Sequence, residues 1–475
     1  MVVWRVGALL LVSGGRVFGS FVNDGFLYFC GYVHRFVGGK YFPMVFVAKY
    51  DIEEGRLVWF RVVEDIRGWA YSVLVKDSYV YVSGLLADVG GGFIICLSSD
   101  DGKFLWGYVA EKCFKGLLDL GDYVLAYGEG QFTILKREGY VVESVVVELR
   151  NSIGEWFPVN VMKAIYVDGK IYAVGYQWYL VSERRVFDGF LICFSKDLEV
   201  EWAEGFGTGE FNEYFTDICF HNKHLYMSGF STKMGKESTE VKGVIAAKFS
   251  LNGTPLWVKV FEDGRCESAQ SIHVFNGDIY IVGTYRGNMS SLHDILVLKI
   301  SGESEATAWT IGGSLEEFCW KSIPYREGIV VYGRTATWSF NETEPHPIII
   351  YWPLDSVGEA KWDIENWEPI RVEKKPTPIP STPYKMVFQN LELRKRKTYC
   401  KKYVFKIVGK EITLNFAHGL LSSERKTAKT TPISPTKTPI PQTSKIPPIT
   451  MVVLAITIPA IIICYIIAKR TMLRR

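Results

Sequence analysis

Residues 276–284 read NGDIYIVGT, and close copies of this phrase recur along most of the chain. The copies are DGFLYFCGY (24–32), DSYVYVSGL (77–85), DGKIYAVGY (168–176) and NKHLYMSGF (222–230), with looser copies at GDYVLAYGE (121–129) and REGIVVYGR (326–334). The closing glycines are Gly31, Gly84, Gly128, Gly175, Gly229, Gly283 and Gly333. Self-similarity every 40 to 50 residues or so, in short β-strands, is typical of β-propeller blades.

Each repeat divides into four expected strands. The first precedes the phrase, as in ESAQSIHVF (267–275), and the second is the phrase itself, as in IYIVGT (279–284). The third is an apolar run: VFVAKY (45–50), FIICLS (93–98), FLICFS (190–195), VIAAKFS (244–250), ILVLKIS (295–301) and IIIYW (348–352). The fourth begins near Trp59, Trp106, Trp202, Trp257, Trp309 or Trp362, while the third repeat has VVESVVVE (141–148) instead.

Runs as apolar as these third strands need cover on both faces, and stacked blades supply it. We therefore predict an all-β fold, a seven-bladed β-propeller of four-stranded blades over residues 1–370. Asp-Gly and Asn-Gly pairs such as Asp24-Gly25 predict tight hairpins, and the closing glycines predict close backbone approach. VWRVG (3–7) resembles another fourth strand. It is expected to close the ring against the last blade; the alternative is a remnant of an earlier blade.

The turns before the tryptophans resemble a known family. SLNGTPLW (250–257), SSDDGKFLW (98–106) and YDIEEGRLVW (50–59) are similar to the turn-then-Trp signature of quinoprotein-type blades, and the whole unit is similar to repeats of bacterial and archaeal surface propellers. The resemblance implies the fold. It carries over no activity, cofactor or metal, because no cofactor-binding residue can be matched. SSDDGKFLW also approaches the sialidase-type Asp box, but a β-turn with a packing tryptophan is favoured.

Composition narrows the class of protein further. The chain is 48% hydrophobic, with 26 Tyr, 29 Phe and 14 Trp, which suits a β-rich core. Residues 371–475 carry 21 Lys and Arg against 4 Asp and Glu, whereas the first 370 residues carry 33 against 47. An acidic body disfavours nucleic-acid binding. Most cysteines lie in apolar runs and no CxxC pair occurs, so core packing is favoured over metal or redox chemistry. Only five Gln occur, which favours a thermophile.

The C-terminal part changes composition after the repeats. We expect a Pro/Thr linker at 371–383, a small basic β segment at 384–425 and a Pro/Thr/Ser-rich stalk at 426–448. Residues 449–468 are uncharged and long enough to cross a bilayer as a helix. The basic end, 469–475, predicts a cytoplasmic C-terminus and an extracellular propeller.

The start of the chain is harder to reconcile with export. GALLLVSGG (7–15) is a weak apolar stretch without a clear cleavage site. We therefore expect either a misplaced start or lost leader, or alternatively a cytoplasmic propeller on a tail anchor.

One end of the blades is the expected binding face, because long second-to-third loops and the connections between blades share it. The candidate residues are Glu64, Asp65, Trp178, Arg184, Glu210, Glu213, Glu262, Asp263, Arg286, Glu316, Glu317 and Trp338. For any single acid, ordinary solvated charge is the favoured interpretation. Asn252, Asn288 and Asn341 lie in N-x-S/T sequons, although Asn252 is also explained as a turn residue.

Two functions remain open from the sequence. The favoured one is a membrane-anchored cell-surface propeller that binds a protein, glycan or envelope component without catalysis, metal or cofactor. The alternative is an extracellular enzyme, either a quinoprotein-like oxidoreductase or a polysaccharide-cleaving enzyme. A third idea is that residues 391–410 cap the acidic face.

Overall fold

The computed structural model describes residues 5–420. Within that range it omits 12–14, 38, 151–155, 182–183, 208–210, 234–240, 262–265, 287–292, 303–304, 313–315, 336–345, 355–370, 379–380, 384–386, 391–392, 399, 403–406 and 410–413. The described residues form strands and turns without an α-helix, and Met1–Ser423 make one compact unit.

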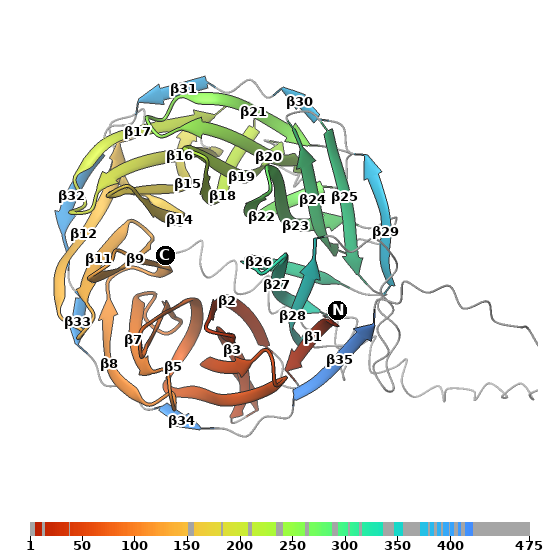
Figure 1. Ribbon diagram of the computed structural model, residues 1–475. Helices are drawn as coiled ribbons and strands as arrows, with labels where there is room; N and C mark the ends of the chain where they lie inside the picture. Colours follow the sequence, from red (N-terminus) through yellow and green to blue (C-terminus); the bar gives the residue numbers. More distant parts are fainter. Residues whose placement is uncertain are drawn as a thin grey trace, which may run out of the picture. The chain divides into compact units, whose positions relative to one another are not determined.

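The strands form antiparallel four-stranded units that follow one another around a ring, as in a β-propeller (Figure 1). The first two units are β2 (Gly15–Asn23), β3 (Phe26–Val37), β4 (Lys40–Asp51) and the start of β5 (Arg56–Lys76), then the end of β5, β6 (Tyr79–Leu86), β7 (Gly92–Ser98) and β8 (Phe104–Ala110). The third is β9 (Phe114–Asp119), β10 (Tyr123–Gly128), β11 (Gln131–Lys136) and β12 (Val141–Arg150), with β13 (Trp156–Pro158) on β12.

Three further units have the same antiparallel order. They are β14 (Asn160–Val167), β15 (Lys170–Val181), β16 (Arg184–Ser195) and β17 (Val200–Gly207); β18 (Phe211–His221), β19 (His224–Lys233), β20 (Val241–Ser250) and β21 (Pro255–Phe261); and β22 (Cys266–Phe275), β23 (Asp278–Arg286), β24 (His293–Ser301) and β25 (Glu305–Gly312). The four predicted strands of the 267–312 repeat are thus confirmed.

The last unit takes its outer strand from the beginning of the chain. It consists of β26 (Glu317–Tyr325), β27 (Gly328–Thr335), β28 (His346–Pro353) and β1 (Arg5–Leu11). β1 pairs antiparallel with β28, with Ala8 opposite Ile350. The expected ring closure by the N-terminal strand is therefore confirmed, and it pairs an edge that would otherwise be open. Trp4 and Trp362 themselves lie outside the described residues.

Consecutive units are joined by buried apolar side chains. Each hydrophobic cluster of the described residues combines two neighbouring units, and one of them joins Phe29 and Phe46 of the first unit to Tyr332 and Ile349 of the last. The third strands are buried almost throughout because a neighbouring sheet covers each face. Cys96 and Cys193 in third strands, and Cys30 in the second strand β3, are buried free thiols, as expected.

The repeated phrase determines two features of the backbone, a tight hairpin at its start and a close approach between strands at its closing glycine. Asp24 and Gly25 have φ of 50° and 80°, and Asn276 and Gly277 have 50° and 88°, which is the two-residue hairpin geometry that the sequence predicted. A β-carbon on Gly283 would lie 1.8 Å from the Ser268 carbonyl oxygen, and all seven closing glycines meet the neighbouring strand in this way. The prediction of close backbone approach is confirmed.

The tryptophans of the fourth strands pack between units. Trp59 lies 6.1 Å from Tyr28 between ring centroids, and its Nε1 donates a hydrogen bond to the Ser99 carbonyl in the next unit. Gly102, in the turn after Ser99, approaches the Trp59 ring so closely that a β-carbon would lie about 3.0 Å from it. Gly139 and Gly253 approach Trp106 and Trp202 in the same way. A packing role therefore accounts for the turn-then-Trp pattern.

The C-terminal segment forms a belt, which we define as β29–β35, around the outside of the ring (Figure 1). Its strands are β29 (Arg371–Pro378), β30 (Ser381–Pro383), β31 (Val387–Asn390), β32 (Leu393–Lys397), β33 (Cys400–Lys402), β34 (Ile407–Gly409) and β35 (Leu414–Leu420). They pair antiparallel with β25, β21, β17, β12, β8, β5 and β1, in that order. The belt thus runs backwards around the ring and covers the outer edge of each unit.

The belt uses residues for which the sequence suggested a linker at 371–383 and a small basic segment at 384–425. The belt lies along the outer edges of the units. The sequence analysis had instead considered that residues 391–410 cap the acidic face. Strands of three to eight residues, two of them (β29 and β30) containing proline, give little periodic signal, and proline is tolerated on edge strands. Each strand contributes main-chain hydrogen bonds to an edge that would otherwise be exposed.

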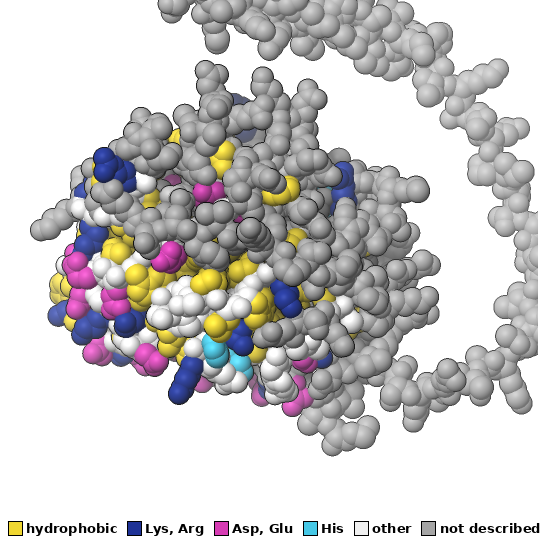
Figure 2. All heavy atoms as spheres, turned by 90° about the horizontal axis from the view of Figure 1, so that it is seen from above, with side chains coloured by type: hydrophobic (Ala, Val, Ile, Leu, Met, Phe, Trp, Pro, Cys, Tyr) yellow, Lys and Arg dark blue, Asp and Glu magenta, His cyan; other side chains and the backbone are white. Residues whose placement is uncertain are grey.

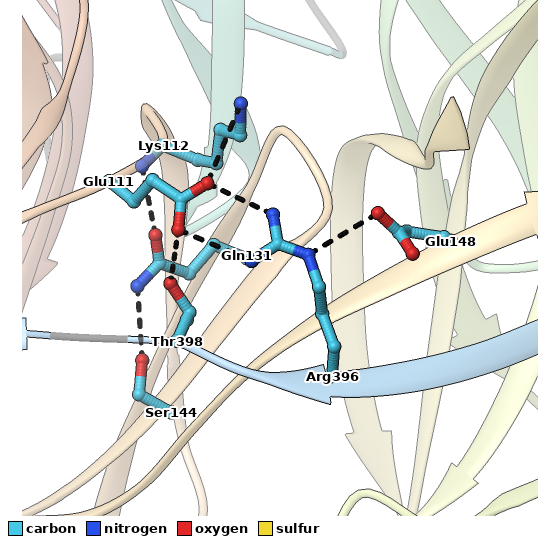
Figure 3. A network of polar contacts seen from close by, with 7 residues as sticks. All are labelled: Glu111, Lys112, Gln131, Ser144, Glu148, Arg396 and Thr398. Atoms are coloured by element: carbon cyan, nitrogen blue, oxygen red, sulfur yellow. Dashed lines mark hydrogen bonds and ion pairs between the residues drawn. The ribbon is translucent and has the colours of Figure 1, made fainter. Parts of the chain in front are cut away.

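Arg396 fastens the belt to the third unit (Figure 3). Its guanidinium lies 2.9 Å from Glu111 Oε1 and 3.3 Å from Glu148 Oε1, and Thr398 Oγ1 donates to Glu111 at 2.7 Å. The hydrogen bonds from Arg396, and secondly the one from Thr398, lower the pKa of Glu111 to about 2. A belt strand is thereby bonded both to the edge of the third unit and to the connection that precedes it.

Candidate binding face

The two ends of the ring differ in their connections. At one end, here the turn end, tight hairpins such as Asp24-Gly25 and Asn276-Gly277 join first and second strands. At the other, the loop end, lie the second-to-third connections and the connections between units. Antiparallel pairing within every unit imposes this division, and the loop end is the face that the sequence analysis chose.

A line of aromatic rings at the loop end runs outward from the innermost strands. We define the aromatic path as Trp320, Phe18, Tyr32, His34, Tyr41 and Phe36. Successive ring centroids along it are 4.7, 5.7, 5.3, 5.7 and 5.0 Å apart. The rings therefore form one continuous contact series across two units.

Irregularities in the innermost strands place the inner members of the path. The register between β26 and β27 shifts around Trp320, and the register between β2 and β3 shifts around Phe18. Such β-bulges re-aim a side chain that regular pleating would turn elsewhere. The bulges lie opposite Gly333 and Gly31, whose missing side chains let the strands approach.

The outer members of the path are exposed. Phe36 is 62% exposed and Tyr41 57%, and Trp320 at the inner end is 36% exposed. Exposed large rings that contact one another indicate a binding surface more strongly than single scattered apolar side chains do. Val89, in the corresponding loop of the second unit, is exposed as well. The loop end thus offers a surface suited to a ligand with apolar faces.

Arginines border the aromatic path. Arg67 lies over the Phe42 ring at 3.9 Å and 3.9 Å from Asp88 Oδ1. Arg35 NH1 lies 3.8 Å from Glu64 Oε1. These pairs are long and partly exposed, so each contributes little to stability.

Arg16 and Arg334 lie at the inner end of the path. Arg16 is 6.0 Å from the Trp320 ring centroid, and its Nε is buried without a hydrogen-bond partner among the described residues. Arg334 lies 4.3 Å over Phe318 and 3.7 Å from Glu316, a carboxylate that is also 3.2 Å from His293. Burial, and then the charge of Arg16, lower the pKa of Arg334. The two cations Arg16 and Arg334 therefore lie near each other. The carboxylate beside Arg334 is that of Glu316, which also contacts His293.

A second group of rings covers the loop end of the fourth and fifth units. Tyr214 stacks on Phe230 with centroids 4.8 Å apart and also contacts Tyr176 at 5.0 Å. Trp178, a predicted site residue, contacts Phe157 at 4.9 Å. The aromatic character of the loop end is therefore not confined to one pair of units.

Polar side chains from several innermost strands form a buried axial cluster. Lys321 Nζ donates to the Thr216 carbonyl at 2.7 Å and lies 4.0 Å from Asp217 Oδ1. His273 Nε2 and Ser322 Oγ are 2.9 Å apart, and burial lowers the pKa of His273 to about 4. Burial also lowers the pKa of Lys321. The cluster therefore places the buried imidazole of His273 in the same set of innermost strands as the Lys321–Asp217 contact.

Several predicted face residues occupy different environments. Glu64 and Glu316 are partly exposed and lie beside arginines, and Arg286 is exposed at the end of β23. Glu213 and Glu317 are fully buried, and Glu317 accepts a hydrogen bond from Thr335 Oγ1 at 2.9 Å. These two carboxylates are thus internal groups that do not extend an exposed acidic surface.

Other predicted residues cannot be placed in the site. Asp65 and Arg184 belong to β5 and β16, but their side chains lie outside the described set. Glu210, Glu262, Asp263, Trp338, Asn288 and Asn341 lie outside the described residues. Asn252 is exposed in the turn after β20, where its side-chain oxygen accepts from the Thr254 N–H at 3.3 Å. Its role as a turn residue is confirmed.

The sequence analysis missed the aromatic path and the axial cluster. Trp320, Phe18 and Lys321 lie in first strands, and nothing in those strands alone reveals a bulge. The closing glycines offered one signal in the sequence. A β-bulge is expected opposite a glycine that approaches its neighbouring strand closely, so the residues paired with each closing glycine were candidates. Among the described residues, no group of three or more His, Cys, Asp or Glu could hold a metal ion.

Comparison with known proteins identifies no family for this chain. No protein-family model and no curated protein matches the chain, so the resemblance to quinoprotein-type blades is without support from a family. Solved structures with a similar arrangement include the WD40 domain of Neurospora crassa Pan2. That likeness has 9% identity and a TM-score of 0.43, covering 72% of this chain and 90% of that one.

Two other solved structures show a similar degree of likeness. The β-propeller domain of the Trilobed protease from Pyrococcus furiosus has 10% identity and a TM-score of 0.42, with 71% of this chain and 93% of that one covered. Drosophila Semaphorin 1a, extracellular domains 1–2, has 8% identity and a TM-score of 0.41, with 78% and 95% covered. The strand pairing of the present chain remains the basis for the propeller assignment.

Proposed function

We propose that this protein is a membrane-anchored cell-surface propeller whose loop end binds a protein, glycan or envelope component without catalysis. The exposure of contacting aromatic rings on the aromatic path carries this proposal, because water disfavours such a surface unless a ligand covers it. The tight hairpins of the turn end offer no comparable series of loops. Figure 2 shows that acidic and basic side chains are interspersed with apolar ones on the side of the molecule seen there.

We also propose that the ring has seven blades. The seven copies of the repeated phrase, the apolar clusters between successive units and the pairing of β1 with β28 support that number. A closed ring removes the edge strands that would otherwise invite association. An experimental structure with a different number of sheets around the axis would contradict it.

The membrane anchor is a proposal from the sequence. Residues 449–468 and the stalk before them lie outside the described residues. Within the described part of the chain, no helix has the length and apolarity needed to cross a bilayer. The uncharged run followed by Lys469, Arg470, Arg474 and Arg475 supports a single span with the propeller outside.

Protease treatment of intact cells tests the surface assignment. Cleavage in the stalk at 426–448 should release a folded propeller into the medium, while a cytoplasmic control protein stays intact. Full protection of the propeller on intact cells, with cleavage after lysis, would contradict an extracellular location and support the cytoplasmic alternative.

Binding by the loop end is tested separately from location. Tyr41→Ser and Phe36→Ser should weaken attachment of the released propeller to cells stripped of it. Tyr140→Ser is the matched control, because Tyr140 is 68% exposed in the β11–β12 turn at the turn end. Equal attachment of all three variants would contradict a binding role for the aromatic path.

A further inference from the structure

At the inner end of the aromatic path, the two arginines Arg16 and Arg334 have one carboxylate, Glu316, beside them among the described residues. Among the described residues, Arg16 has no ion pair, and a buried nitrogen of its guanidinium has no hydrogen-bond partner. Arg334 is 3.7 Å from Glu316, which it shares with His293. An uncompensated, partly buried cation is costly. An anion bound there would remove that cost.

The positive charge of these two arginines is opposite in sign to the net charge of residues 1–370. The first 370 residues carry 33 Lys and Arg against 47 Asp and Glu. A cationic pair on an acidic body favours a ligand with discrete anionic groups over one attracted to general positive charge. Guanidinium groups also match the planar geometry of carboxylates and the oxygens of sulfate.

The aromatic path supplies the second half of the recognition. Trp320 contacts both Arg16 and Phe18, at 6.0 and 4.7 Å. From Phe18 the rings continue to the exposed Tyr41 and Phe36 in steps of 5.0 to 5.7 Å. Phe18 and Tyr32 are buried, so the rings open to a ligand are Trp320 at the inner end of the path and Tyr41 and Phe36 at the outer end. The C–H faces of sugar rings carry slight positive charge and pack well on aromatic faces, which are negative.

We propose that the loop end binds an acidic saccharide, with its carboxylate or sulfate groups at Arg16 and Arg334 and its sugar rings on Trp320, Tyr41 and Phe36. This inference rests on the proposed binding function and names its ligand class. An acidic peptide would satisfy the arginines, but it would make little use of exposed ring faces at both ends of the path.

Calorimetric titration of the purified full chain tests the proposal. The probes are tetragalacturonate, a sulfated dextran oligosaccharide of similar length, neutral maltotetraose and a poly-glutamate peptide. Either acidic saccharide should bind, more weakly at high salt, and maltotetraose should bind far less. The ratio of the uronate to the sulfate affinity identifies which anionic group the arginines accept.

Variants separate the two halves of the site. Arg16→Gln should weaken binding of the acidic saccharide about tenfold or more, because charge-assisted hydrogen bonds are lost. Tyr41→Ser should weaken binding without changing its salt dependence. Arg56→Gln, an exposed arginine at the turn end, is the matched control and should bind normally. Circular dichroism and thermal midpoints confirm that each variant is folded.

Several results would overturn the inference. Equal binding of maltotetraose, unchanged binding by Arg16→Gln, or the absence of binding to both acidic saccharides would each contradict it. Preferential binding of poly-glutamate would contradict a saccharide ligand while leaving the proposed surface-binding function intact. The protease experiment on intact cells tests that function independently.

Discussion

The two ends of the ring use the same aromatic residue types for different purposes. At the turn end, Tyr28 and Trp59 pack together and Trp59 donates to Ser99 of the next unit, so the rings hold neighbouring units together. At the loop end, Tyr41 and Phe36 contact each other but remain largely exposed. Composition alone does not distinguish these roles. For these four residues, position along the strand, and therefore the end of the ring, decides whether the side chain packs between units or stays exposed.

Glycines provide the strongest test of this difference. Gly283, near the loop end of β23, faces the Ser268 carbonyl at a distance that no β-carbon can occupy. Gly283→Ala should therefore reduce the free energy of unfolding by about 4 kcal/mol or more. Gly277, in the hairpin at the turn end, has open space around it and φ of 88°. Gly277→Ala should cost only about 1 kcal/mol.

Denaturant unfolding of both glycine variants measures these costs. Similar losses at the two positions would show that close backbone approach does not constrain the loop end. Insoluble Gly283→Ala protein beside soluble Gly277→Ala protein would agree with the expected order.

The axial cluster between the two ends should make stability depend on pH. His273 has a pKa of about 4 in the folded chain because it is buried, against about 6.5 when unfolded. Between these values the unfolded state binds more protons, so folding stability falls as pH falls from about 6.5 to 4. The loss should reach up to about 3 kcal/mol. Asp217, Lys163 and Lys321 are the charged groups whose fields act on the imidazole.

Thermal unfolding across this pH window, compared with His273→Gln, measures the contribution of the imidazole. The variant should show a shallower fall in stability than the native chain. An NMR titration of His273 near pH 6.5 in the folded protein would contradict its burial as a neutral group.

The belt should make a smaller contribution at the outer edge. Arg396→Gln removes both ion pairs with Glu111 and Glu148, and because these groups are partly exposed we expect a loss of about 1 kcal/mol. The lowered pKa of Glu111 means that this stabilisation is present above about pH 4.5 and is lost as pH falls toward 2. Limited proteolysis should cut the belt of Arg396→Gln faster than that of the native chain.

A matched substitution distinguishes the ion pairs from general loss of charge on the belt. Lys401→Gln removes one positive charge from β33, and it should leave the cleavage rate unchanged. Equal protection of the Arg396→Gln and native belts would contradict the fastening role of Arg396.

The smallest effect on stability is expected at the exposed rings. Tyr41→Ser and Tyr140→Ser, at the loop end and the turn end, should each change the free energy of unfolding by less than about 0.5 kcal/mol. Only the first should reduce ligand binding. Chemical denaturation and calorimetry on the same samples compare the two effects, and a binding loss in Tyr140→Ser would contradict the assignment of function to the loop end.

Much of the blade architecture could be predicted because each repeat has the same turn residues, apolar runs and closing glycine in the same order. The Asn276-Gly277 hairpin and the close approach of Gly283 follow from backbone rules, and the order of strands follows from them. The belt could not be predicted, since its short strands gain stability only from edges already formed by the ring. The aromatic path was missed because Phe18 and Trp320 owe their orientation to bulges, which depend on pairing with a neighbouring strand.

Hydroxyl-radical footprinting of the propeller on intact cells, compared with the purified chain, tests most directly whether the loop end is the binding end. Aromatic side chains report their own exposure in such an experiment. Phe36, Tyr41 and Trp320 should be protected on cells, while Tyr140 at the turn end should react equally in both samples. Protection of Tyr140 with full reactivity at Phe36 and Tyr41 would contradict the account.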